Sequence, residues 1–133
     1  MSQSNVDIVQ RGFEHFMATG EPHWEAFHEE IEVHDHDTMD QGEYRGHTGV
    51  GRWLQDWAAA WSEFAMEPEE FLDVGEHVVM FFCMKATGVS SGVRLERKDA
   101  MVFALRDGKV VRVDYYNNRA DSQGALANDS AQR

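Results

Sequence analysis

Apolar residues recur at helical spacing in two stretches of the chain. The stripe in the first stretch consists of Val6, Val9, Phe13, Phe16 and Met17. Gly20 can end this helix in a left-handed conformation. Pro22 then suits the first turn of a shorter helix, which carries Trp24 and Phe27 on one side and is expected to end near Glu30. The clearest stripe predicts a third helix and consists of Val50, Trp53, Leu54, Trp57, Ala58, Trp61 and Phe64.

Elsewhere the apolar pattern has the period of two that is typical of β-strands. A first strand is expected at residues 31–36 and a loop at residues 38–47, which hold two glycines and no apolar period. Four further strands, rich in β-branched and aromatic residues, are expected at 71–74, 77–88, 93–106 and 109–116. Short turns join them, and Asp107 with Gly108 suits a hairpin because both positions tolerate positive φ. Residues 120–126 are predicted to add a final helical turn.

This order of elements predicts an α+β domain. Three helices should cover one face of a curved antiparallel sheet, and such a cone-shaped sheet encloses an apolar pocket. No repeat or low-complexity linker divides the chain, so a single domain is expected over residues 5–127. Residues 1–4 and 128–133 are expected to be frayed.

The composition excludes several classes of protein. The chain has 133 residues, with 24 acidic against 12 basic side chains and a formal net charge of -12, so nucleic acids and anionic membranes would be repelled. The longest apolar run is too short to span a bilayer, and the amino terminus lacks the pattern of a signal peptide. The single cysteine, Cys83, lies in an apolar run where a buried thiol is the common case. We therefore expect a soluble cytoplasmic protein.

Two features of the chain are similar to a known protein family. One is the order of the predicted elements, and the other is a set of four segments: YRGHTGVGRWLQDW, FLDVGEHVVM, ALRDGKVVRVDYY and NNRADSQGAL. Together they resemble the SnoaL-like polyketide cyclases within the ketosteroid isomerase-like, nuclear transport factor 2-like superfamily. The resemblance covers residues 5–127. Members of this superfamily include isomerases, dehydratases, cyclases, epoxide hydrolases and non-catalytic binding domains, so the activity has to be argued from the site.

Asp35 is the first candidate catalytic residue. Because strand side chains alternate, Asp35 shares a face with Ile31 and Val33, and all three point inward together. The resemblance implies that the aspartate of VHD is a general base that moves a proton next to a carbonyl group. A carboxylate beside apolar walls is destabilised as an anion, which suits a base. The alternative is a structural aspartate that accepts backbone N–H bonds in the following loop.

Asp99 is the second candidate catalytic residue, because it shares the parity of Met101 and Phe103 on an apolar strand face. The segment DAMVF resembles the isomerase strand in which a protonated aspartic acid donates a hydrogen bond to a developing oxyanion. Arg97 lies on the same face, however. The alternative is therefore a salt bridge that keeps Asp99 ionised and leaves it with a structural role.

Two positions depart from the patterns of the family. The isomerases carry a tyrosine on the first helix, where this chain has Gly12 or Phe13. Many SnoaL-like chains carry an aspartate just after the last strand, where this chain has Asn118. An amide can orient a substrate but cannot accept its proton at neutral pH.

A metal site is not expected. His34 and His36 are two residues apart and therefore share a strand face, but that face is opposite to Val33 and offers no third ligand in a known metal motif. We expect these histidines at a subunit interface or in solvent, and no cofactor or metal is predicted.

The pocket should be apolar, although the tryptophan stripe is also what a plain core would need. Residues predicted to bind substrate are Phe13, Phe16, Met17, Trp24, Phe27, Trp57, Trp61, Met80, Phe82, Met101, Phe103, Tyr116 and Asn118. These features predict a small-molecule enzyme that performs cofactor-free proton transfer, such as isomerisation, cyclisation or dehydration, on an apolar carbonyl-containing substrate. The alternative is a non-catalytic domain for hydrophobic-ligand binding or dimerisation.

A homodimer is also predicted. Ala100, Val102 and Ala104 lie on the outward-facing parity of their strand and form an apolar strip that a monomer would expose.

Overall fold

The computed structural model describes residues 2–36 and 42–122. Helix α1 spans Ser2–Thr19, as the first stripe predicts, and therefore includes residues that were expected to be frayed. It ends where the N–H of Gly20 donates to the carbonyl of Phe16 at 2.7 Å, with Gly20 at φ +79°. A residue without Cβ adopts this left-handed conformation at little cost, so the glycine ends the helix.

The short second helix is a single 3-10 turn, η1, over Trp24–Ala26. The prediction that it continues to Glu30 is wrong, because strand β1 spans Phe27–Asp35. Phe27 pairs with Val110, which is 83 positions further along the chain. Pairing of Phe27 with this distant strand starts β1 here, and a local apolar pattern contains no information about such a partner.

Helix α2 spans Gly46–Ala60 and is four residues shorter at its carboxyl end than the tryptophan stripe predicts. Trp61 already belongs to strand β3, which spans Trp61–Val74, and it pairs with Gly88 of β4. The carbonyl of Ala60 accepts a hydrogen bond from the N–H of Val89 at 3.1 Å. A hairpin that is distant in sequence therefore ends this helix.

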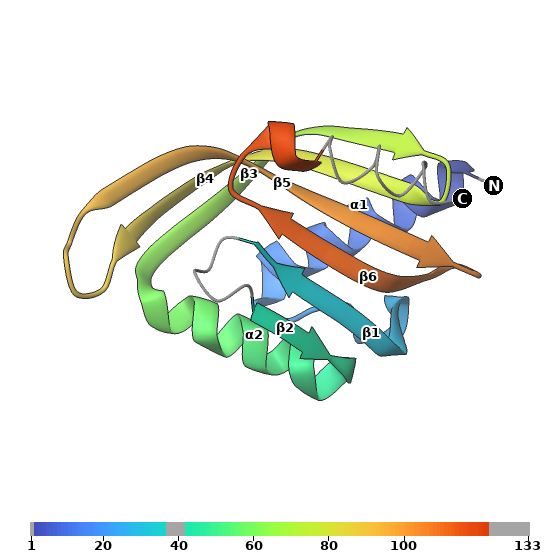
Figure 1. Cartoon of the computed structure of the whole chain (residues 1–133), viewed down its shortest axis with the longest axis horizontal. Coiled ribbons are helices and arrows are strands. Elements are labelled where there is room, and N and C mark those ends of the chain that lie inside the picture. The colour runs from blue at the N-terminus through green and yellow to red at the C-terminus, as the bar shows by residue number, and fades with distance from the viewer. Residues whose placement is uncertain (1, 37–41, 123–133) are drawn as a thin grey trace.

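Six strands form one curved, unclosed sheet in the order β2-β1-β6-β5-β4-β3 (Figure 1). The remaining strands are β2 (Gly42–Arg45), β4 (His77–Gly88), β5 (Arg94–Arg106) and β6 (Lys109–Tyr116). The predicted antiparallel α+β sheet is confirmed with one exception, since β1 and β6 run parallel. The hairpin turn at Asp107 and Gly108 has the expected positive φ values of 52° and 80°.

Both edges of the sheet differ from the prediction. Strand β2 lies inside the predicted loop at residues 38–47, of which residues 38–41 lie outside the described part of the chain. Strand β3 begins ten residues earlier than predicted and contains Pro68. Because β3 pairs only with β4, proline can occupy this edge strand without breaking a second ladder, and the register shifts between Pro68 and Glu70. Residues 119–122 are helical, and the rest of the predicted final turn lies outside the described residues.

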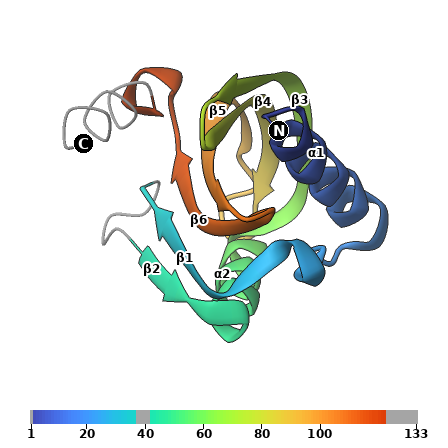
Figure 2. The same cartoon turned by 90° about the vertical axis from the view of Figure 1, so that its right-hand side faces the viewer.

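Helices α1 and α2 pack against the inner, concave face of the sheet (Figure 2). The core between them is formed by alternate residues of the strands, as period-two patterning requires. On β1 these residues are Ile31, Val33 and Asp35, which are at most 2% exposed. The sequence therefore predicted correctly which face of β1 points inward.

The outer face of the sheet carries a second apolar cluster, formed by Val79, Phe81, Ala100, Val102 and Tyr116. The homodimer was predicted because Ala100, Val102 and Ala104 would be exposed in a monomer. This exposure is wrong for Ala100 and Val102, which are already buried in the single chain. Part of the cover comes from Arg119, whose guanidinium lies 4.8 Å from the centroid of the Phe81 ring. The homodimer itself stays a prediction. Within the described residues, no helix is long and apolar enough to cross a membrane.

Candidate functional site

The inner face of the sheet and the helices line a partly open cavity of about 100 Å³. Ile8, Val9, Phe13 and Phe16 of α1 form one wall, and side chains of α2 and the strands form the others. The described residues that complete the lining are Gly12, Pro22, Ala26, Phe27, Ile31, Val33, Val50, Trp53, Leu54, Trp57, Met66, Met101, Phe103, Val110 and Val113. All of these side chains are apolar except for the indole N–H groups of Trp53 and Trp57, so the cavity suits an apolar guest.

Six of the residues predicted to bind substrate line this cavity: Phe13, Phe16, Phe27, Trp57, Met101 and Phe103. Four others belong to the core or the surface instead. Met80 and Phe82 are completely buried on β4, and Trp61 packs against the Trp57 ring at a centroid distance of 6.1 Å. Met17 belongs to the predicted stripe but is 43% exposed, in the last turn of α1.

The last three predicted wall residues also lie elsewhere. Trp24 packs edge-on against Phe27 at a centroid distance of 6.1 Å. Tyr116 faces the outer side of the sheet, where its ring stacks on His36 at 4.5 Å, so the prediction that it lines the pocket is wrong. The amide of Asn118 donates to Asp121 at 2.8 Å and its oxygen accepts from the backbone N–H of Asp121, so Asn118 caps the final helical turn.

Asp35 lies at the end of β1 and is 2% exposed. The indole N–H of Trp53 on α2 donates to its Oδ2 at 2.8 Å. Both partners are buried, and a hydrogen bond from a buried donor to a carboxylate is among the stronger ones in proteins. The bond fixes the rotation of the Trp53 indole, and with it the wall of the cavity that Trp53 forms.

Asp99 lies on β5, is completely buried and is held by two neighbours. Arg97 makes a forked contact, with Nε at 2.6 Å from Oδ1 and a terminal nitrogen at 2.9 Å from Oδ2. The hydroxyl of Tyr115 on β6 also donates to Oδ2. This is the salt bridge that the sequence offered as the alternative, and a carboxylate that accepts these three bonds orients its neighbours rather than donating to a ligand.

The two carboxylates belong to one polar cluster at one end of the core. Asp35 is the register partner of Tyr115 in the β1–β6 pair, and Tyr115 is the partner of Met101 in the β5–β6 pair. The Tyr115 ring lies 6.4 Å from the ring of Trp53. Neither carboxylate is among the described residues that line the cavity, but Trp53 and Met101 are. Trp53 therefore separates the apolar cavity from the buried polar cluster.

Trp53, Tyr115 and Arg97 belong to this cluster but are not among the predicted site residues, although Arg97 was expected as a partner of Asp99. Trp53 and Tyr115 both had a signal in the sequence. Tyr115 shares the inward parity of Val113, whereas Tyr116 does not, and Trp53 lies on the same helical stripe as Trp57. The direction of an indole N–H depends on tertiary packing, so its bond to Asp35 could not be predicted.

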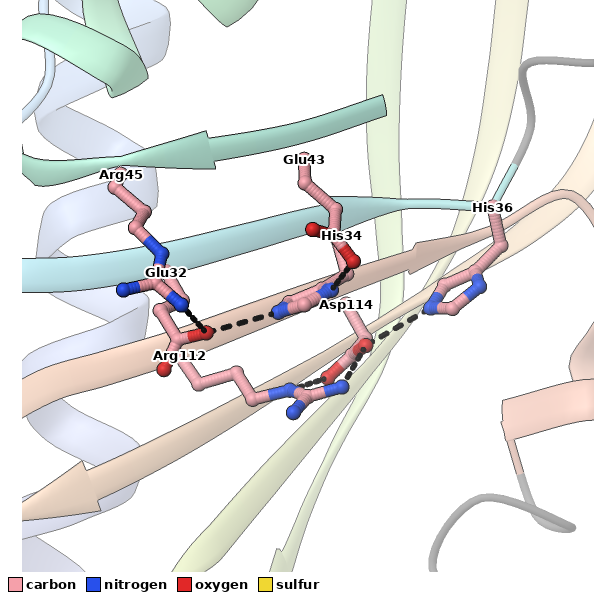
Figure 3. A network of polar contacts seen from close by, with 7 residues as sticks. All are labelled: Glu32, His34, His36, Glu43, Arg45, Arg112 and Asp114. Atoms are coloured by element: carbon pink, nitrogen blue, oxygen red, sulfur yellow. Dashed lines mark hydrogen bonds and ion pairs between the residues drawn. The ribbon is translucent and has the colours of Figure 1, made fainter. Parts of the chain in front are cut away.

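His34 of β1 and His36, which follows directly after this strand, belong to a separate polar network on the outer face (Figure 3). His34 lies 3.3 Å from a Glu32 oxygen and 3.5 Å from a Glu43 oxygen. His36 contacts Oδ1 of Asp114 at 2.9 Å. His34 thus contacts one carboxylate of its own strand and one of β2, and His36 contacts one of β6. Among the described residues, no group of three or more His, Cys, Asp or Glu side chains is placed to hold a metal ion.

Asp114 is the charged centre of this outer network. The guanidinium of Arg112 donates two hydrogen bonds to the carboxylate of Asp114, from Nε to Oδ2 at 2.8 Å and from a terminal nitrogen to Oδ1 at 3.0 Å. Burial by itself raises the pKa of Asp114, but the hydrogen bonds from Arg112 and His36 outweigh it and hold the pKa below its ordinary value of 3.8. Asp114 is therefore ionised at neutral pH and ties β6 to β1.

Comparison with known proteins agrees with this geometry. The family model of the SnoaL-like domain matches residues 9–113. The chain belongs to the SnoaL-like family. No functionally curated protein matches this SnoaL-like chain. The match covers most of the described residues, including Asp35, Trp53 and Asp99, but it begins after the cavity-lining Ile8 and ends before Tyr115.

Solved structures share the fold of this SnoaL-like domain at low sequence identity. An NTF2-like protein of unknown function from Burkholderia pseudomallei has a TM-score of 0.76 and 20% identity, covering 90% of this chain and 94% of that one. TerC, crystallised with polyporic acid, has a TM-score of 0.75 and 19% identity, with 91% and 96% covered. A protein from Jannaschia sp. assigned as a SnoaL-like polyketide cyclase has a TM-score of 0.73 and 17% identity, with 91% and 90% covered. At these identities the likeness shows the fold alone.

Proposed function

We propose that this SnoaL-like domain binds a small, mainly apolar organic molecule in the cavity between α1, α2 and the inner face of the sheet. The observation that carries the proposal is the lining, whose side chains are apolar apart from the indole N–H groups of Trp53 and Trp57. A dry cavity of comparable size, about 150 Å³, holds benzene in an engineered protein. At about 100 Å³, this cavity suits a single small ring or a short branched chain.

The driving force is the removal of apolar surface from water. Each CH₂ group that a ligand buries contributes about 0.8 kcal/mol, so affinity should rise with ligand size until the cavity is full. A charged ligand would have to give up its hydration without an ionic partner on the lining, which costs several kcal/mol. The expected ligand is therefore neutral over the part that enters the cavity.

Binding can be tested with simple probes, because Trp53 and Trp57 line the cavity and report on it through their fluorescence. Titration with benzene and toluene should give a saturable change, and a polar molecule of similar size, such as glycerol, should give none. Ligand at about 100 times its Kd should also raise the free energy of unfolding by about 2.7 kcal/mol. If neither aromatic probe saturates the fluorescence or raises the melting temperature, the proposal fails.

Proton transfer by Asp35 is a second candidate function, and one specific observation favours it. Asp35 follows the cavity-lining Val33 by two positions on the same strand face, and Trp53 contacts both the cavity and the carboxylate. A ligand that displaces the Trp53 indole could place the carbon next to its carbonyl group against this base. The carboxylate would then take the proton from the carbon next to the carbonyl, and the resulting enolate would be protonated again from the same oxygen.

In this second function Asp99 would act as a positioning residue for Tyr115.

The test of proton transfer is exchange of the α-hydrogens of cyclopentanone for deuterium in heavy water, followed by mass spectrometry. Asp35→Asn should lower the exchange rate by roughly 10² to 10⁴. Asp73→Asn, at an exposed position of β3, is the control and should leave the rate unchanged. Exchange no faster than in buffer, with a ketone that binds, would refute proton transfer and leave ligand binding standing.

A further inference from the structure

Gly12 occupies an unusual position for a glycine. It lies in the middle of α1, far from either end of a helix that spans Ser2–Thr19. Its neighbours at helical spacing, Ile8, Val9 and Phe16, all line the cavity, and Gly12 lines it as well. A glycine in a helix interior is destabilising relative to alanine, because it loses more backbone freedom on folding and buries no side chain.

Neither of the usual structural reasons for a glycine applies to Gly12. Its φ is not positive, unlike that of Gly20 at the end of the same helix. No other chain segment approaches its backbone closely, because a Cβ added at Gly12 would meet nothing within 4 Å. The helix would therefore accept a side chain here, and because Gly12 lines the cavity, we expect that side chain to take up part of its open space.

We infer that Gly12 is a specificity-determining position, which leaves room on the α1 wall for the far end of the ligand and so sets the largest molecule that fits. This inference rests on the proposed function of apolar ligand binding. It also narrows the ligand class to a neutral ring with a short apolar substituent that packs against α1. A methyl group at position 12 would take the space of about one CH₂ group of the ligand.

The same chain contains a matched control. Gly51 lies inside α2, also has no positive φ, and a Cβ added there would also meet nothing within 4 Å. Gly51 is not among the described residues that line the cavity. Gly12→Ala and Gly51→Ala should therefore raise helix stability alike, but only the first should change binding.

The experiment measures the affinities of benzene, toluene, ethylbenzene and propylbenzene by tryptophan fluorescence in the wild type and both variants. In the wild type, affinity should rise roughly fourfold per added CH₂, which corresponds to about 0.8 kcal/mol, until the longest member that fits. Gly12→Ala should move this limit one member shorter and weaken the previously longest ligand by roughly fourfold or more. Gly51→Ala should follow the wild-type series. Gly12→Ser repeats the test with a second small side chain.

The outcomes separate the inference from the function on which it rests. Thermal melts of both alanine variants, expected to be a few degrees above the wild type, establish that they are folded. If the wild type binds and Gly12→Ala keeps the same size limit, or if Gly51→Ala shifts it equally, the role of Gly12 is refuted and ligand binding stands. If the wild type binds no member of the series, the proposed function fails and the inference fails with it.

Discussion

Replacing Asp35 by asparagine separates the charge of this side chain from its ability to accept a hydrogen bond. Asparagine has nearly the same shape and keeps a carbonyl oxygen that can accept the bond from Trp53. Alanine removes the acceptor and leaves the indole N–H of Trp53, on a side chain that is 8% exposed, without this partner. The two variants therefore test whether Asp35 stabilises the fold through its charge or through its oxygen.

The expected magnitudes follow from this geometry. A buried donor that loses its partner costs about 1–3 kcal/mol, and the missing carboxyl group leaves a small void, so Asp35→Ala should destabilise by about 2–4 kcal/mol. A hydrogen bond to a charged group contributes about 1 kcal/mol more than a neutral one, but asparagine also removes the cost of burying a charge. We expect Asp35→Asn to lie within about 1 kcal/mol of the wild type.

Urea unfolding followed by circular dichroism measures these differences without relying on Trp53 as a reporter. A double-mutant cycle with Trp53→Phe isolates the bond, and a coupling energy of about 1–3 kcal/mol between Asp35→Ala and Trp53→Phe is expected. Equal losses in Asp35→Asn and Asp35→Ala would mean that the charge itself holds the fold together. That result would refute the view that Asp35 is retained for a role other than stability, and the proton-transfer candidate would lose its main support.

Four further outcomes are expected. The pKa of Asp114 is lower in the folded state than in the unfolded state, so the ionised side chain stabilises the fold above about pH 4, and this stabilisation is lost as the pH falls through the folded-state pKa. In urea unfolding, Asp114→Asn should therefore reduce the difference between the midpoints at neutral and at acidic pH. Burial and the hydrogen bond to Asp56 raise the pKa of Tyr44 to about 12. Burial and the negative charge of Asp114 raise the pKa of Tyr116 to about 12. Stability should therefore fall as pH rises from about 10 toward 12, and less so in Tyr116→Phe. A chelator should leave the melting temperature unchanged, and stoichiometric metal in the purified protein would contradict this. Sedimentation should show a species of twice 15.2 kDa, and a monomer at micromolar concentration would refute the homodimer.

Local chemistry was enough to predict several features of this domain. The alternation of Ile31, Val33 and Asp35 placed the carboxylate on the inner face, because side-chain direction in a strand depends only on position. Asp107 and Gly108 form the expected turn, because the tolerance for a positive φ depends on the residue type and can be read from the sequence. The local patterns of all the helices and strands, taken together, were also sufficient to predict the α+β class and the SnoaL-like family.

Tertiary structure alone decided where elements end and which side chains meet. Phe27 is extended because it pairs with Val110 of β6, and α2 stops at Ala60 because the β4–β5 hairpin supplies its next hydrogen bond. The same holds for the site. Trp53 is eighteen positions from Asp35, and Tyr115 is sixteen from Asp99, yet each pair shares a buried hydrogen bond. Periodicity shows which face a residue occupies, but the partner across the core depends on how helix and sheet pack, which no local pattern contains.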